Sequence, residues 1–163
     1  MSDVSIIGLI SDTHGLLRPE AVVALQGSDL IIHAGDVGNA SILKQLGALA
    51  PVVAVRGNID SDAYASQLPL TAVVEAGSVL IYVLHDIHQL DLDPAAAEFN
   101  LVISGHSHKP GRTEERGVVY VNPGSAGPRR FRLPITVARL NLAELRWSVD
   151  FIDLTDEFLK PIT

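Results

Sequence analysis

Seven polar side chains of types that bind divalent cations lie at or just beyond the ends of apolar stretches. Carboxylate and amide oxygens and imidazole nitrogens are the donors that such cations accept in proteins. The chain has no cysteine, so thiolate ligands are excluded. His88 lies in a loop and is interpreted as solvated. The candidate ligands are Asp12, His14, Asp36, Asn58, His85, His106 and His108.

Two of the loops carry candidate ligands two residues apart, in Asp12-Thr13-His14 and His106-Ser107-His108. In extended chain such side chains point the same way, so each pair is predicted to hold one cation. Either triplet alone is more often a solvated loop, and Asn58 after Gly57 is alone more typical of a turn. Because candidate ligands recur after five apolar runs, the pattern as a whole favours a metal site.

The number and kind of ligands are sufficient for two cations. Cations ~3.5–4 Å apart, as in two-metal hydrolases, require a bridging anion because they repel each other. Asp36 is the predicted bridge. A water between two such cations is acidified, and the resulting hydroxide can attack phosphorus in line. Asp36, Asn58 and His14 are therefore assigned to catalysis, and a phosphate is the expected reacting group because the loaded site is electropositive.

Alternating strand and helix patterns position these loops in the first part of the chain. The predicted order is strand 4–10, helix 19–26, strand 29–34, helix 40–50 and strand 51–55. Such alternation predicts parallel strands with right-handed crossovers, and sites in open α/β sheets form beyond the carboxyl ends of the strands. The three ligand loops of this region are expected at that edge.

The remainder of the chain is richer in strand patterns. A hairpin is predicted from 70–75 and 79–84, and a short helix is predicted to begin at Pro94. In the last strand Leu145, Trp147, Val149 and Phe151 alternate with other residues, which predicts one packed face. With no repeat or long linker, residues 1–163 are predicted to form one α/β domain of two stacked sheets flanked by helices. The other predicted strands are 100–104, 118–121, 135–140 and 145–152.

The composition of the chain restricts the classes of molecule that it is expected to bind. The formal net charge is −7, which argues against a broad nucleic-acid or anionic membrane interface. No apolar run reaches the ~18 residues of a membrane span, and the N-terminus has no signal-peptide pattern, so the expected location is cytoplasmic. A small phosphorylated substrate is the expected partner, and a homo-oligomer is left open.

A basic segment follows Asn122-Pro123-Gly124-Ser125 and contains Arg129, Arg130 and Arg132. Solvated loop charge is one interpretation. The other is that the segment borders the site, where Ser125 or Arg129 would bind the non-reacting part of a phosphorylated substrate.

The motifs, taken in order, resemble those of the calcineurin-like metallophosphoesterase superfamily over residues 4–110. The small size, the 122–125 segment and Pro128-Arg129 are similar to its small bacterial and archaeal phosphodiesterase branch, to about residue 141. The matching stretches are Asp12-Thr13-His14, Gly35-Asp36, Gly57-Asn58-Ile59-Asp60, His85 and Gly105-His106-Ser107-His108.

The resemblance implies a four-layer αββα sandwich of two mixed sheets and two divalent metal ions. Manganese is the first expectation, with nickel, iron, cobalt, zinc or magnesium as alternatives. Asp60 is expected to orient a neighbouring ligand or loop. By resemblance the first metal is held by Asp12, His14, Asp36 and His108, and the second by Asp36, Asn58, His85 and His106.

Two departures from the family pattern keep alternatives open. Ile59 stands where many members carry a histidine that protonates the leaving group, and Ile59 cannot transfer a proton. Asp86 stands where the branch usually has glycine. The leading hypothesis is a metal-dependent phosphodiesterase. The alternative is a metal-binding scaffold with little turnover, like the related retromer subunit Vps29, and a nuclease is disfavoured by the acidic charge.

Overall fold

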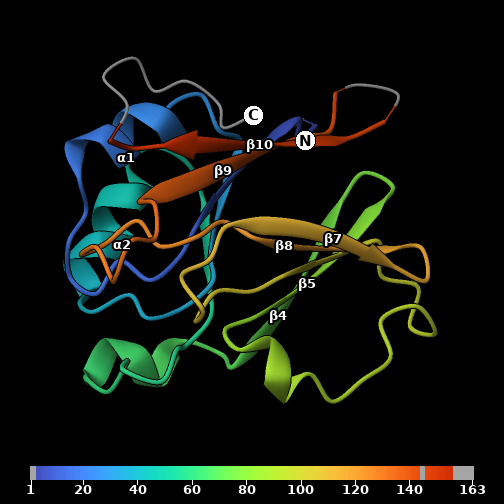
Figure 1. Ribbon diagram of the computed structural model, residues 1–163, viewed down its shortest axis with the longest axis horizontal. Helices are drawn as coiled ribbons and strands as arrows, with labels where there is room; N and C mark the ends of the chain where they lie inside the picture. The colour runs from blue at the N-terminus through green and yellow to red at the C-terminus, as the bar shows by residue number, and fades with distance from the viewer. Residues whose placement is uncertain (1–2, 144–145, 156–163) are drawn as a thin grey trace.

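Two five-stranded mixed sheets face each other in the computed structural model, which describes residues 3–143 and 146–155 (Figure 1). The first sheet has the order β10-β9-β1-β2-β3. Strands β1, β2 and β3 are parallel, whereas β9 is antiparallel to both β1 and β10. Its strands are β1 (Ile6–Ile10), β2 (Leu30–His33), β3 (Val52–Ala54), β9 (Thr136–Asn141) and β10 (Ser148–Asp153).

The second sheet has the order β4-β5-β6-β8-β7. Strands β5, β6 and β8 are parallel, and the edge strands β4 and β7 are each antiparallel to their neighbour. Its strands are β4 (Thr71–Ala76), β5 (Val79–Leu84), β6 (Leu101–Ile103), β7 (Gly111–Glu115) and β8 (Val118–Asn122).

The main core lies between the sheets. Ile7 and Leu9 of β1 contribute to the same buried cluster as Ile81 and Val83 of β5. The next residue of β1, Ile10, belongs to a second cluster on the outer face of the first sheet. Because both faces of β1 are covered, its sequence is a continuous apolar run without alternation.

Two helices, α1 (Pro19–Leu25) and α2 (Ala40–Gly47), cover the outer face of the first sheet. Helix α1 has proline at its first turn, where no backbone N–H is needed. Helix α2 begins at an Asn39 side chain that accepts a hydrogen bond from the N–H of Ile42 at 3.3 Å. Buried Leu25 and Leu46 anchor the two helices in the second cluster.

The outer face of the second sheet is covered differently. Residues 87–99, which consist of the short 3-10 helix η2 (Ile87–Gln89), loop and turns, pack there. Tyr82 of β5 meets Phe99 with ring centroids 5.2 Å apart. The α/β sandwich of two mixed sheets is thus confirmed, with its fourth layer made mainly of loop.

Most predicted elements are confirmed within a few residues. The helix predicted to begin at Pro94 is wrong, because residues 94–98 form successive turns closed by bonds such as Phe99 N–H to Pro94 O at 2.9 Å. Strand β7 was missed because its residues are all exposed and carry no apolar alternation. The 3-10 helix η1 (Ala63–Gln67) was also missed. Leu145 lies outside the described residues.

Trp147, Val149 and Phe151 pack against the main core, as their alternation predicts. Within the described ranges, no helix has the length and hydropathy that a membrane span requires.

Candidate metal centre

All seven predicted ligands lie in loops that follow the carboxyl ends of strands β1, β2, β3, β5 and β6. The strands are parallel within each sheet, so these loops emerge at one edge of each. Six of the seven side chains form two groups of three, and the ligand atoms within each group lie within 4.8 Å of one another. The groups are Asp12, His14 and His108, and Asp36, His85 and His106.

The backbone brings the ligands together by left-handed turns and not by extended chain. Asp12, His14 and Asp36 have φ angles of 55°, 46° and 57°. His106 and His108 have φ angles of 70° and 62°. Each such non-glycine conformation costs roughly 1–3 kcal/mol and persists only where the surrounding structure enforces it. The strain is therefore concentrated at this site.

The structure places His106 and His108 in different groups, unlike the extended-chain geometry that predicts a shared cation. His108 Nε2 lies 3.3 Å from Asp12 Oδ1. His106 instead joins the group of Asp36 and His85, and the centroids of the His106 and His85 rings lie 5.2 Å apart. The left-handed turns send the two imidazoles in different directions, which agrees with the division that the family resemblance implies.

Asp12 is fully buried, and its two carboxylate oxygens have different surroundings. Oδ2 accepts hydrogen bonds from the Ser11 hydroxyl at 2.6 Å and from the His106 N–H at 3.0 Å. Oδ1 has no hydrogen-bond donor and lies 3.6 Å from His14 Nε2 and 3.9 Å from His85 Nε2. Burial alone would raise the pKa of Asp12, but the neighbouring imidazoles and Ser11 hold it below its ordinary value.

Asp36 lies between the two groups. Its Oδ1 accepts a hydrogen bond from the Ile59 N–H at 3.1 Å. Its Oδ2 is 3.5 Å from His14 Nε2 of the first group and 3.3 Å from His85 Nε2 of the second. One oxygen atom is therefore placed to reach both groups. Burial opposes ionisation, but His85 and the Ile59 N–H hold the pKa of Asp36 below its ordinary value.

His85 is held in one ring orientation. Its Nδ1 lies 2.7 Å from the carbonyl oxygen of Ala34, which can only accept, so Nδ1 carries the proton. The Nε2 atom faces Asn58 Oδ1 at 3.1 Å as well as Asp36. Burial lowers the pKa of His85, but Asp36, the Ala34 carbonyl and Asp12 outweigh it and the pKa is raised in the metal-free chain.

The residues present fit a divalent cation. Asp12 Oδ1 and His14 Nε2 are buried atoms without a hydrogen-bond partner, and they face each other. In neutral His85, Nε2 and Asn58 Oδ1 are both acceptors in contact. Asn58 is exposed, but Asp12 Oδ1 and His14 Nε2 are buried, and buried polar atoms without a partner are costly unless a cation or a proton lies between them. This donor set suits a hard or borderline divalent metal ion.

Two glycines allow the loops to reach the carboxylates. A Cβ at Gly57 would lie 2.1 Å from Asp36 Oδ1, and one at Gly105 would lie 2.6 Å from Asp12 Oδ2. Any side chain at either position would displace a carboxylate. Both residues directly precede a predicted ligand, so close approach explains why glycine occupies these positions.

Asp60 joins the ligand loops that follow β2 and β3. It accepts hydrogen bonds from the N–H groups of Gly57 at 2.8 Å, Gly38 at 3.1 Å and Val37 at 3.3 Å. The Tyr64 hydroxyl donates a fourth bond at 2.8 Å. Burial and this bond to the Asp60 carboxylate raise the pKa of Tyr64. Asp60 thus contacts the loops rather than either ligand group.

Sequence reasoning missed His33, which is fully buried at the end of β2. Its Nδ1 accepts from the Gly35 N–H at 3.1 Å, so Nε2 carries the proton and donates to Thr13 Oγ1 at 3.0 Å. The Thr13 hydroxyl donates in turn to the Val37 carbonyl at 2.7 Å. Burial lowers the pKa of His33 to about 4. The signal in the sequence is a histidine at the end of an apolar run, directly before a ligand loop.

The remaining predicted residues lie in different surroundings. The Ser125 hydroxyl is buried and donates to the Asp12 carbonyl at 3.0 Å. Arg129 is exposed. Asp86 Oδ2 lies 3.8 Å from His106 Nε2, and its Oδ1 accepts from the His88 N–H at 3.0 Å. His88 is exposed, as predicted.

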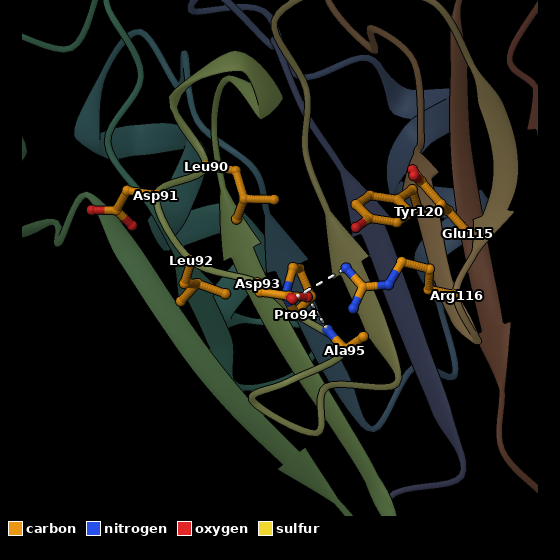
Figure 2. A pocket seen from close by; sticks show the side chains of 9 residues that line it. All are labelled: Leu90, Asp91, Leu92, Asp93, Pro94, Ala95, Glu115, Arg116 and Tyr120. Atoms are coloured by element: carbon orange, nitrogen blue, oxygen red, sulfur yellow. Dashed lines mark hydrogen bonds and ion pairs between the residues drawn. The ribbon is translucent and has the colours of Figure 1, made fainter.

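A separate cleft of ≈ 590 Å³ lies between residues 90–95 and the β7–β8 hairpin. Figure 2 shows its ion pair, Arg116 Nη1 to Asp93 Oδ2 at 3.1 Å, with Tyr120 nearby. The pair is well exposed, so it contributes little to stability. The cleft shares no lining residue with the ligand groups and contains no histidine.

Comparison with known proteins identifies the domain. The family model of the calcineurin-like phosphoesterase superfamily domain matches residues 6–145. This chain belongs to the calcineurin-like phosphoesterase superfamily. Members of this family are metal-dependent, which agrees with the two ligand groups.

Relatives support the same assignment. The chain is 36% identical over 149 residues to a probable metallophosphoesterase of Methanothermobacter thermautotrophicus, covering 83% of this chain and 86% of the relative. It is 28% identical over 137 residues to a phosphodiesterase of Methanocaldococcus jannaschii, covering 72% and 82%. The fold is similar to that of Zn²⁺-complexed Vps29 from Entamoeba histolytica, with a TM-score of 0.78, 21% identity, and coverage of 96% and 97%.

Proposed function

We propose that this calcineurin-like domain hydrolyses phosphoesters, phosphodiesters in particular, with two divalent cations held by its seven predicted ligands. The observation that carries the proposal is Asp36 Oδ2, which lies within 3.5 Å of an imidazole nitrogen from each group. A carboxylate oxygen in this position can bind two cations and offset their repulsion.

The proposed ligand sets follow the two groups. The first adds the shared Asp36 to Asp12, His14 and His108, and the second adds Asn58 to Asp36, His85 and His106. Manganese is the metal we expect first. When bound, the cations would lower the pKa of water and neutralise charge on the phosphoryl oxygens.

The chain's own residues keep this site ready for a cation. Asp12 and Asp36 stay ionised at neutral pH because their pKa values are lowered. The Ala34 carbonyl keeps the proton of neutral His85 on Nδ1, so Nε2 presents its lone pair to the site. Asp60 and His33 hold the loops in place. Asp36, Asn58 and His14 are the catalytic residues in this proposal. Asp36 Oδ2 lies 3.5 Å from His14 Nε2, and Asn58 Oδ1 lies 3.1 Å from His85 Nε2.

The chain offers no acid at the position after Asn58. Ile59 is 40% exposed and has no proton to donate. Esters with acidic alcohols, such as aryl diesters, should therefore react faster than alkyl esters. Arg129 remains our proposed contact for the non-reacting part of the substrate. Ser125 would contribute by fixing the Asp12 backbone or by turning its hydroxyl toward that part.

The test compares an aryl phosphodiester with the matching monoester. The metal-free protein receives Mn²⁺, and rate and bound metal are measured for the native chain and for Asp36→Ala and His108→Ala. His88→Ala is the matched control because His88 is exposed and outside both groups. We expect manganese-dependent hydrolysis that both site variants lose and His88→Ala retains. Equal rates in native chain and Asp36→Ala would refute the proposal.

A scaffold function is the second candidate. The likeness to Vps29 and the absence of an acid at Ile59 favour it. In that case the native chain would bind metal in stoichiometric amount, lose it in Asp36→Ala, and hydrolyse neither ester. Because the two functions share the metal site, only turnover separates them.

A further inference from the structure

A second depression shares one residue, Ser107, with a ligand loop and is lined by Ser107, Lys109, Phe131, Arg132 and Leu133. Ser107 lies between His106 and His108, so the depression begins at a ligand loop. Its volume is ≈ 750 Å³, within the range of about 300–1,000 Å³ that small-molecule pockets span. No step of the proposed hydrolysis uses it.

Phe131 is the feature of this pocket that folding does not explain. Its side chain is 92% exposed, the most of any large apolar residue in the described part of the chain. Its φ of 54° is also unfavourable for an aromatic residue. An aromatic ring presented to solvent beside a candidate active site offers a flat apolar surface for a planar ligand group.

Two cationic residues line the same pocket as this ring. Lys109 lies on the ligand-loop side and Arg132 directly follows Phe131. The lining contains no acidic residue, and among the described residues neither cation forms a salt bridge. Arg129 and Arg130 directly precede Phe131 in the same basic segment, and both are exposed.

We infer that this pocket binds one ester arm of the substrate, a nucleoside whose base stacks on Phe131 and whose second phosphate pairs with Lys109 and Arg132. The inference rests on the proposed phosphodiesterase function. The substrate class is a small nucleotide diester with an additional phosphate. A long nucleic acid is disfavoured because the chain carries a net charge of −7, so only local cations attract phosphate.

The reaction of such a substrate balances without a further reactant. The oxygen of one water forms a bond to phosphorus, and one ester P–O bond breaks with its electron pair on the departing alcohol oxygen. That oxygen takes a proton derived from the water. The products are one phosphomonoester and one alcohol, and the group in the pocket is unchanged.

The test uses three diesters that all release 4-nitrophenol. They are ethyl 4-nitrophenyl phosphate, thymidine 5′-(4-nitrophenyl phosphate), and the latter with a 3′-phosphate. The native chain should prefer the thymidine ester to the ethyl ester and the 3′-phosphorylated ester to both. In Phe131→Ala the ratio of kcat/KM for thymidine ester over ethyl ester should fall about tenfold, the order that base stacking supplies.

Matched variants distinguish the contribution of the Phe131 ring to substrate preference from that of the charges on Lys109 and Arg132. Phe131→Trp should keep the thymidine preference, because tryptophan offers a larger stacking face. Arg132→Ala and Lys109→Ala should each reduce the preference for the 3′-phosphate. Val73→Ala, on exposed β4 outside the pocket, should keep the native ratios. No thymidine preference in the native chain, or an unchanged ratio in Phe131→Ala, would overturn the inference.

A binding measurement tests the nucleoside pocket independently of the proposed phosphodiesterase activity. If no ester is hydrolysed, the phosphodiesterase proposal fails, and titration with thymidine 3′,5′-bisphosphate tests the pocket directly. Binding that weakens about tenfold in Phe131→Ala and is retained in Val73→Ala would support the pocket. Equal binding by all three proteins would overturn it.

Discussion

Asp60→Asn is the substitution that best tests how the ligand loops are held together. The Asp60 carboxylate accepts four hydrogen bonds, from the N–H groups of Gly57, Gly38 and Val37 and from the Tyr64 hydroxyl. Asparagine has nearly the same shape but only one oxygen. Its NH₂ group must replace one carboxylate oxygen, and it then faces donors instead of accepting from them.

The expected cost follows from this count. Suppose that the asparagine oxygen accepts from the N–H groups of Gly57 and Val37. Its NH₂ group then faces the Gly38 N–H, which loses its acceptor, whereas the Tyr64 hydroxyl can rotate to accept a hydrogen bond from the NH₂ group. An unsatisfied buried donor costs about 1–3 kcal/mol, and the retained bonds lose charge assistance worth about 1 kcal/mol together. Asp60 is buried, so solvent relieves little of this. We expect unfolding to require about 2–4 kcal/mol less free energy.

The measurement is urea unfolding of the metal-free chain, monitored by circular dichroism. Tyr64→Phe removes one of the four bonds and should cost about 1 kcal/mol. Asp62→Asn changes an exposed neighbour and should stay within about 0.5 kcal/mol of the native chain. If Asp60→Asn is as stable as Asp62→Asn, the four bonds do not hold the loops, and the reasoning is refuted.

Three other outcomes are expected. Burial depresses the pKa of His33 from 6.5 to about 4. As pH falls below 6.5, the unfolded chain therefore takes up a proton at this residue, whereas the folded chain does not. The free energy of unfolding should then fall between pH 6.5 and pH 4, by up to about 3 kcal/mol. Urea unfolding of metal-free His33→Gln over this range should show a shallower loss, and equal slopes would contradict the assignment. Gly57→Ala should abolish Mn²⁺ binding in calorimetry, because its Cβ would lie 2.1 Å from Asp36 Oδ1. Gly47→Ala in α2 is the control, because nothing lies within 4 Å of a Cβ there. This control should bind Mn²⁺ normally, and its free energy of unfolding should rise by about 0.5–1 kcal/mol. Mn²⁺ at a hundredfold excess over its Kd should raise the Tm by about 5–10 °C, and an equal rise in Asp36→Ala would show that the ion binds elsewhere.

The sequence by itself determined which residues form the candidate site and which strands deliver them. Apolar runs are local patterns, so strand ends at Ile10, His33 and Ala54 could be predicted to within a residue or two. The order of the motifs predicted the family, which comparison confirmed. Strand β7 and the turns at Pro94 could not be predicted, because an exposed edge strand lacks an apolar pattern and a proline suits both a helix start and a turn.

Only the tertiary structure decided how the ligands are grouped. The His106 N–H donates to Asp12 Oδ2 across 94 residues of sequence, while His108 turns to the other oxygen of the same carboxylate. The left-handed turns that produce this arrangement are unfavourable locally. Backbone hydrogen bonds between loops hold them, such as Asp12 N–H to Gly35 O and His14 N–H to Asp36 O, both at 3.0 Å. The role of His33 likewise depends on partners in two loops. A local pattern contains no distances between segments remote in sequence, so these features required the folded chain.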